Sequence, residues 1–214
     1  LYLIERGYPM KNASVFTGNH YLLSERQRLA LVRATSSRQA AALRRNREVI
    51  GPVPGKEVHI DGFNIIITLE IALSGSTLLK CMDGTIRDLA GLRGTYRIIG
   101  KTHEAIRLLL CRLKELETER AVFYLDSPVS NSGKLRALIL DTAREEAIDC
   151  QVHLVPNADA VLKETEHVIT SDAIILDHCK SWLNPLPGLL SSSLPGLRFV
   201  DLTMQGPETG PKTS

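Results

Sequence analysis

The sequence predicts an α/β fold in which helices cover both faces of a mostly parallel β-sheet. From residue 56 onward, strand-like apolar runs alternate with helix-like segments, which is the pattern of βαβ units. Three of these runs end on an aspartate, namely Val58–Asp61, Ala121–Asp126 and His167–Asp172. Because parallel strands deliver their carboxyl ends to one edge of a sheet, we expect these three carboxylates to lie close together.

The chain of 214 residues changes character once, at the Gly-Pro-Val-Pro-Gly segment 51–55. That composition ends a helical region and starts a new unit. We expect a small basic helical region at 1–50, an α/β domain at 56–202 and a disordered tail at 203–214, which is rich in Gly, Pro and Thr. With 43% hydrophobic residues, the chain can bury one sizeable core.

Each element has a local signal. In the N-terminal region, Ser24 opens a helix as N-cap with Gln27 completing a capping box, and Leu29, Val32 and Leu43 supply apolar spacing. We expect the five strands of the sheet near 57–61, 120–126, 151–155, 167–171 and 197–202. We expect helices near 65–74, 102–118, 133–147, 159–164 and 172–182. The pair Asp83-Gly84 marks a tight turn, so residues 78–98 are expected to form a hairpin excursion.

The three strand-terminal aspartates predict a metal site. Converging carboxylates repel one another and are costly to desolvate unless a cation lies between them, so Asp61, Asp126 and Asp172 indicate a hard divalent cation. Asn64 can hold the loop of Asp61 or reach a water on the metal. Gly62 permits a sharp turn there, and an Asp-Gly pair can be only a turn, but its place directly after a strand favours function.

The loop after Asp126 offers a second polar segment, at the start of a helix that would suit a phosphate. It resembles a P-loop only superficially, because Pro128 stands at the first glycine and Leu135 replaces the Ser/Thr that holds magnesium. The alternative is a capped helix with Ser132 as N-cap. The residues that could contact phosphate or RNA here are Ser130, Asn131, Ser132, Lys134 and Arg136.

Two further acids have weaker signals. Asp159 begins a short helix, where interaction with the helix dipole alone explains it. Asp177 follows Asp172 by five residues, about 500° of helical rotation, so the two lie roughly 140° apart and Asp177 can only support the site.

Charge is uneven along the chain. Residues 1–50 contain nine Lys/Arg and three acids, whereas the remainder contains 17 of the 26 Lys/Arg and 21 of the 24 Asp/Glu. A basic arm on an acidic body suggests contact with a polyanion, and a solvated helix face is the equal alternative. The arginines that we expect to contact RNA are Arg26, Arg33, Arg44 and Arg47.

The cysteines, histidines and apolar runs limit the kinds of site and the cellular location that the sequence allows. The four cysteines are widely spaced without a Cys-x-x-Cys pair, and the histidines show no ligand spacing, so neither a zinc site nor a disulfide framework is indicated. A reducing cytoplasm fits this cysteine usage. The chain has no run of about 18 apolar residues, so we expect no membrane span. The sequence leaves a homo-oligomer open.

Several segments together resemble the PIN-like nuclease superfamily, in particular its NYN branch. The segments that carry this resemblance are Asp61-Gly62-Phe63-Asn64, Leu125-Asp126, Ala158-Asp159-Ala160-Val161-Leu162 and Thr170-Ser171-Asp172. Longer phrases, at Leu125–Gly133, Arg6–Pro9 and Gly18–Tyr21, look closer still to an uncharacterised prokaryotic family, a domain of unknown function numbered 434. That resemblance extends over about residues 1–183.

The resemblance implies a three-layer α/β/α (Rossmannoid) domain and metal-dependent RNA cleavage with Mg²⁺ or Mn²⁺. It implies Asp61, Asp126, Asp159 and Asp172 as catalytic and metal-binding acids, with Asn64 and Ser171 as supporting residues. The chain departs from the NYN pattern at Ile174, where that branch often carries a second acid, and this departure keeps an inactive RNA-binding module open.

The other alternative is a small-molecule phosphohydrolase or nucleotide-binding protein. A haloacid-dehalogenase-type nucleophile would require Asp-x-Asp after the first strand, and a dinucleotide site would require Gly-x-Gly-x-x-Gly. Neither is present at Asp61–Asn64. The metal-dependent ribonuclease is therefore the first interpretation.

Overall fold

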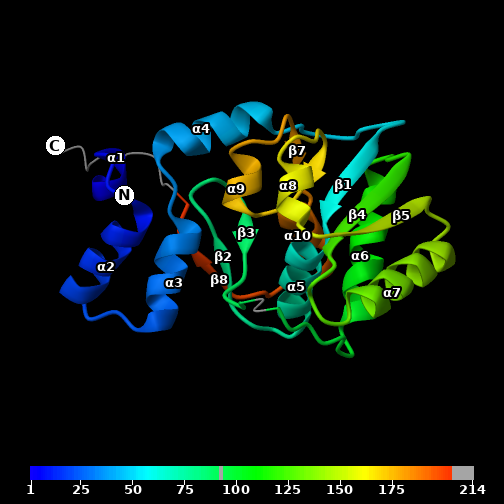
Figure 1. Ribbon diagram of the computed structural model, residues 1–214, viewed down its shortest axis with the longest axis horizontal. Helices are drawn as coiled ribbons and strands as arrows, with labels where there is room; N and C mark the ends of the chain where they lie inside the picture. The colour runs from blue at the N-terminus through cyan, green and yellow to red at the C-terminus, as the bar shows by residue number, and fades with distance from the viewer. Residues whose placement is uncertain (92–93, 204–214) are drawn as a thin grey trace, which may run out of the picture.

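A computed structural model describes residues 1–91 and 94–203, and it confirms an α/β fold built on a five-stranded parallel sheet (Figure 1). The strand order is β5-β4-β1-β6-β7, with every neighbouring pair parallel. The strands are β1 (Glu57–Asp61), β4 (Arg120–Asp126), β5 (Cys150–Val155), β6 (Val168–Ile169) and β7 (Trp182–Leu183). From residue 204 on, the predicted disordered tail lies outside the described residues.

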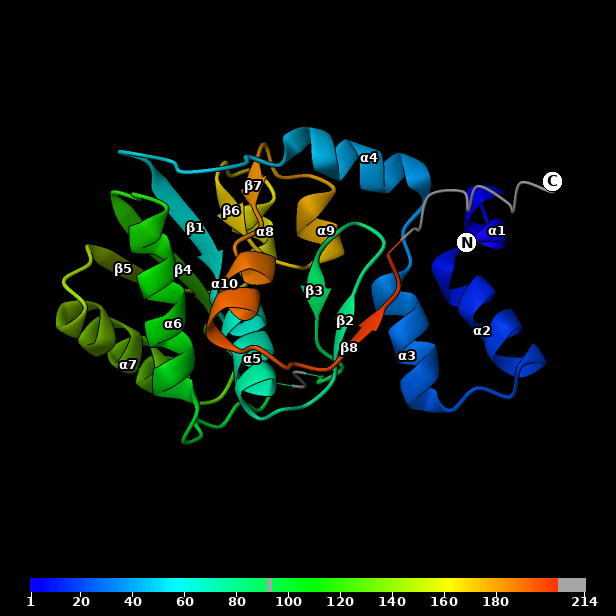
Figure 2. The same cartoon turned by 180° about the vertical axis from the view of Figure 1, so that it is seen from behind.

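Helices cover the two faces of this sheet, as Figure 2 shows from behind. One face packs against α5 (Gly62–Leu73), α6 (Thr102–Glu115), α7 (Ser132–Glu145) and α10 (Leu186–Ser193). The other packs against α8 (Ala158–Leu162) and α9 (Ala173–Leu176). The fully buried side chains of Ile60 and Phe123 belong to the first core, and that of Trp182 belongs to the second.

The expected sheet of one strand and the expected extent of one helix are wrong. The predicted fifth strand near 197–202 forms as β8 (Phe199–Asp201), but it pairs with β2 in a separate sheet. The fifth strand of the main sheet is β7, which lies at the end of a predicted helix over 172–182. That helix ends at Leu176. Trp182 inserts into the core beside α8 and α9, and its indole donates to the carbonyl oxygen of Arg44 (2.7 Å).

The predicted hairpin forms over residues 78–87, the first half of the expected range 78–98. β2 (Leu78–Lys80) and β3 (Ile86–Arg87) pair antiparallel, and Gly84 has a φ of 83° in the turn between them. This positive φ is a conformation that glycine adopts without steric cost. With β8 the hairpin forms a three-stranded sheet of order β3-β2-β8.

The N-terminal region is helical, with α1 (Tyr2–Glu5), α2 (Met10–His20), α3 (Glu25–Ala34) and α4 (Arg38–Arg47). The predicted capping box is present, since Ser24 accepts from the Gln27 N–H and the Gln27 side chain accepts from the Ser24 N–H. Val32 and Leu43 were expected to supply an apolar face, but they stay 40% and 49% exposed.

Buried ion pairs connect the N-terminal helices to the sheet domain. The Arg44 guanidinium, 4% exposed, donates to Asp83 Oδ2 (2.5 Å) and to Asp177 Oδ1 (2.7 Å). The expectation that Arg44 contacts RNA is therefore wrong, because its donors are committed to carboxylates inside the protein. Burial would raise the pKa of Asp83, but Arg87, Thr85 and Arg44 outweigh burial and lower it.

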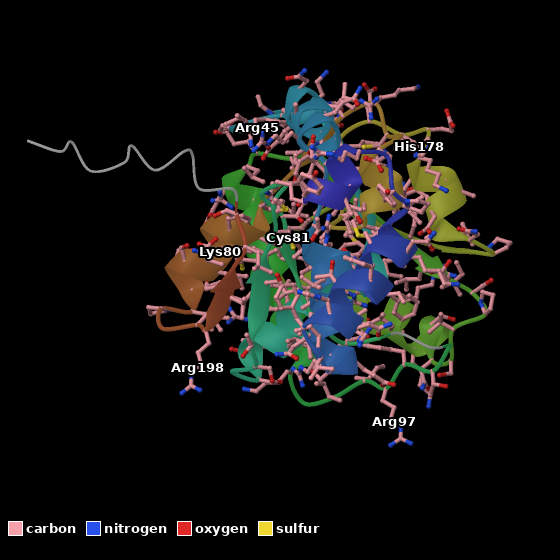
Figure 3. The ribbon with its side chains drawn as sticks, turned by 90° about the vertical axis from the view of Figure 1, so that its left-hand side faces the viewer. Arg45, Lys80, Cys81, Arg97, His178 and Arg198 are labelled. Atoms are coloured by element: carbon pink, nitrogen blue, oxygen red, sulfur yellow. The ribbon has the colours of Figure 1, made fainter. Side chains whose placement is uncertain are left out.

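We expect Arg44→Met to lower the free energy of unfolding by about 3–5 kcal/mol, because it removes one partner of a buried ion pair. The adjacent Arg45 is exposed (Figure 3), so Arg45→Met is the matched control and should change it by less than about 0.5 kcal/mol. Urea unfolding at pH 7 measures both. Equal losses in the two variants would contradict the structural role of Arg44.

Candidate functional site

Four aspartates share one cavity at the carboxyl edge of the main sheet. Asp61 is the last residue of β1, Asp126 is the last of β4, Asp172 follows β6, and Asp159 lies in α8. All four line a cavity of about 510 Å³. The strand order explains this convergence: β1 has β4 on one side and β6 on the other, and the crevice of an open parallel sheet forms where connections leave in opposite directions.

Asp61 is the most deeply placed of the four, at 7% exposure. Burial, with smaller contributions from the charges of Asp172 and Asp159, raises the pKa of Asp61 to about 7, although the Thr170 hydroxyl donates to its Oδ2 (2.8 Å). Its charged form is therefore unfavourable in the protein alone.

Gly62 lets the end of β1 lie against β4. A Cβ at this position would come within 2.5 Å of the Leu125 Cδ2 and 3.1 Å of the Tyr124 carbonyl oxygen. The expected sharp turn is absent, since α5 begins at Gly62 itself. Close approach of two backbones therefore explains the glycine that follows Asp61.

Asn64 joins the loop of Asp61 to the loop of Asp172. Its Oδ1 accepts hydrogen bonds from the Ser171 N–H (2.9 Å) and hydroxyl (3.0 Å). Asp172 Oδ1 in turn accepts from the N–H groups of Ile174 (2.7 Å) and Ile175 (3.3 Å) at the start of α9. Asn64 and Ser171 thus connect the segments that carry these two acids.

The second pair of acids is fixed by α8. Asp126 Oδ1 accepts from the Ala158 N–H (2.8 Å), which ties the end of β4 to the start of this helix. Asp159 is half-buried, and burial together with the charges of Asp172 and Asp126 raises its pKa. Asp177 does not line the cavity, because its carboxylate pairs with Arg44.

The loop after Asp126 has a structural role instead of the predicted phosphate site. Ser130 Oγ accepts from the Tyr96 N–H (3.0 Å), and Asn131 Nδ2 donates to the Tyr96 carbonyl oxygen (2.8 Å). Ser132 is the first residue of α7 and is buried, so it is not the N-cap; Asn131 takes that place with a φ of 62°. None of the five residues expected to contact phosphate lines the cavity, and Lys134 and Arg136 are exposed.

Sequence analysis missed two charged residues of the cavity lining. Arg87 and Asp88, at the end of β3, line the cavity. Asp88 also follows a strand, but β3 is only two residues long and gave no strand-like run. Arg87 is buried and donates to the Ser171 carbonyl oxygen (2.6 Å), to Asp83 Oδ2 (2.6 Å) and to the Arg33 carbonyl oxygen.

The predicted RNA-contacting arginines have separate positions. Arg33 lines the cavity and pairs with Asp88 (3.0 Å). Arg47 donates to the carbonyl oxygens of Leu176 (3.3 Å) and Asp177 (2.7 Å) at the end of α9. Arg26 is exposed. The N-terminal region is therefore packed on the domain, and it contributes to the cavity through α3 rather than as a free basic arm.

The lining has five carboxylates (Asp61, Asp88, Asp126, Asp159 and Asp172) and two guanidiniums (Arg33 and Arg87). Among the residues that the structure describes, no three His, Cys, Asp or Glu side chains form a group that could hold a metal ion as they stand. The four predicted acids thus share a cavity without a preformed coordination cluster. Their chemistry still suits a hard cation, because every anionic side chain of the lining is a carboxylate, which binds through oxygen. The five carboxylates also outnumber the two guanidiniums.

Within residues 1–91 and 94–203, no helix has the length and apolar character needed to cross a membrane.

Two protein families match consecutive segments of the chain. Residues 51–187 match the family described as "Domain of unknown function (DUF5616)", and residues 1–47 match "Protein of unknown function (DUF434)". The similarity to family 434 is therefore confined to the N-terminal helices and does not extend to about residue 183. An uncharacterized protein of Methanocaldococcus jannaschii is 39% identical over 176 residues, which are 82% of this chain and 84% of that protein. No solved structure matches. With the larger match covering the sheet and all four cavity aspartates, the chain belongs to the DUF5616 family.

Proposed function

We propose that this protein is a PIN-like, metal-dependent ribonuclease that hydrolyses phosphodiester bonds in RNA. The observation that carries the proposal is the convergence of Asp61, Asp126, Asp159 and Asp172 on one cavity from four separate segments. Structural acids would have opposite charges beside them. Burial instead raises the pKa of Asp61 and Asp159, and the charge of Asp172 adds to the rise at both.

Mg²⁺ or Mn²⁺ is the proposed cofactor, and Asp61 and Asp172 would hold it with Asp126 and Asp159. Such a cation, when bound, lowers the pKa of a water and neutralises charge on the reacting phosphate. The chain's own groups orient the acids: Thr170 holds Asp61, and Asn64 holds the loop of Asp172 through Ser171. Burial of Asp61 keeps bulk water away from the innermost carboxylate.

The cytoplasm is the proposed location, because all four cysteines are free thiols and suit a reducing compartment. A second candidate function is binding or hydrolysis of a small phosphorylated molecule. The cavity volume of about 510 Å³ favours it, since this lies within the range of small-molecule sites.

We expect Asp61→Asn or Asp172→Asn to lower RNA cleavage by at least about 100-fold, as loss of a catalytic group does. Single-turnover cleavage of labelled single-stranded RNA with Mn²⁺ measures this. Asp141→Asn is the matched control, because Asp141 is exposed on α7 and pairs only with Arg144, and it should leave the rate unchanged.

Affinity for RNA in these variants should hold or rise, because charge repulsion is relieved. Wild-type protein that leaves RNA intact with both Mg²⁺ and Mn²⁺ while still binding it would favour a catalytically inactive RNA-binding module instead.

The pKa of Asp61 predicts a pH-dependent stability of the metal-free protein. Its folded-state value of about 7 exceeds the ordinary 3.8, so the folded protein binds a proton that the unfolded chain releases between these values. The stability that protonation of Asp61 contributes should therefore be lost as pH rises from about 4 to about 7. The free energy of unfolding should fall by an amount on the order of 4 kcal/mol. Asp61→Asn should remove this contribution, so that the variant is more stable than wild type at pH 8 and similar at pH 4.

Urea unfolding of metal-free wild type and Asp61→Asn across this pH range tests the prediction. Mn²⁺ should stabilise wild type most above pH 7, where no proton competes for Asp61. A wild-type pH profile that parallels that of the variant would contradict the raised pKa.

A further inference from the structure

Part of the cavity lining has a chemistry different from that of the four predicted acids. We call it the second wall; it consists of Val32, Arg33, Thr35, Ile67, Asp88 and Ala90. The first three come from α3 and its end, Ile67 comes from α5, and the last two follow β3. Figure 1 shows α3 beside the β2–β3 hairpin. The second wall thus combines the Arg33–Asp88 ion pair with apolar side chains.

Arg33 is held in place by Asp88. Its Nη1 donates to the Asp88 carbonyl oxygen (2.7 Å) and to Oδ1 (3.0 Å), while Asp88 also accepts from the Thr68 hydroxyl (2.8 Å) and the Ala90 N–H (2.7 Å). A guanidinium has five N–H donors, and both of these hydrogen bonds come from Nη1. They orient the group and leave its other nitrogens as donors for a ligand. The Arg33 side chain keeps 28% of its surface exposed. It can therefore contact an anion in the cavity.

The second wall also has an apolar part. Val32 occupies a position expected to pack inward, yet it is 40% exposed and lines the cavity. Ile67 and Ala90 are half-buried beside it. A metal site alone does not require these side chains. A ligand that carries both a phosphate and an apolar ring would contact Arg33 and this surface together.

We propose that the second wall binds one nucleotide of the substrate, with Arg33 on a phosphate and with Val32, Ile67 and Ala90 against the sugar and base; this inference rests on the proposed function. The acids belong to the segment that matches DUF5616, whereas Val32 and Arg33 belong to the segment that matches DUF434. The N-terminal segment therefore determines substrate selection at a site whose acids it does not contain.

Isothermal titration with uridine 5′-monophosphate, adenosine 5′-monophosphate and inorganic phosphate, each with Mn²⁺, tests the wall. Arg33→Met should weaken binding of all three by at least about tenfold, because a charge-assisted contact is lost. Arg26 lies two helical turns earlier in α3 and is exposed outside the cavity, so Arg26→Met is the matched control and should weaken binding less than about twofold. Equal effects of the two variants would show general electrostatics and overturn the role of Arg33.

The variant Val32→Trp distinguishes binding of the nucleoside from binding of the phosphate. It should weaken binding of both nucleotides by at least about tenfold through steric exclusion and leave inorganic phosphate and Mn²⁺ binding within about twofold. Val15→Trp, on the exposed surface of α2, is the control and should change neither. If Val32→Trp fails to fold by circular dichroism, Ala90→Leu provides the same test.

The outcomes distinguish the two proposals. If wild type cleaves RNA and the second-wall variants bind nucleotides as tightly as wild type, the nucleotide-binding role of the second wall is wrong and the ribonuclease proposal stands. Wild type that cuts no RNA but shows the predicted nucleotide losses would keep the second wall and overturn the ribonuclease. Absence of nucleotide binding to wild type would also overturn the second wall.

Discussion

The arrangement of the site depends on the buried carboxylate of Asp83, which accepts hydrogen bonds from Arg44 and Arg87. Arg44 fixes α4 to the sheet domain, and Arg87 extends to the carbonyl oxygens of Ser171 and Arg33. One anion therefore joins the N-terminal helices, the hairpin and the loop before Asp172. Buried ion pairs add little net stability because both charges lose their hydration, but removing one partner is costly. The contribution of Asp83 is therefore to determine that the N-terminal helices, the hairpin and the loop before Asp172 contact one another.

The cavity acids are in the opposite electrostatic situation. Asp83 has two guanidiniums, which lower its pKa despite burial, whereas Asp61 is equally buried with only the Thr170 hydroxyl and backbone to oppose its desolvation. The same fold thus compensates a structural carboxylate fully and leaves a cavity carboxylate uncompensated. Perturbed ionisation of this kind is typical of functional sites, where the missing charge is supplied by a ligand.

How much the sequence predicts depends on whether a signal is local. The parallel sheet and the convergence of Asp61, Asp126 and Asp172 follow from apolar runs that end on an acid, and both are present. Charge pattern could not show that Arg44 faces a buried carboxylate, because its partner Asp83 lies 39 residues away in a hairpin. The loop after Asp126 was misinterpreted for the same reason: its polar side chains bond to Tyr96, more than thirty residues earlier. Strand β7 was missed because only two residues pair.

The central place of β1 has a consequence for synthesis of the chain. Asp61 meets Thr170 across 109 residues, and Asn64 meets Ser171 across 107. Pairing between such distant segments forms late, and a growing chain folds in the order in which it emerges. Until β6 has left the ribosome, the Asp61 carboxylate has neither its hydroxyl partner nor Asp172 beside it. A nascent chain therefore carries Asp61, Asp126 and Asp159 before the cavity is assembled.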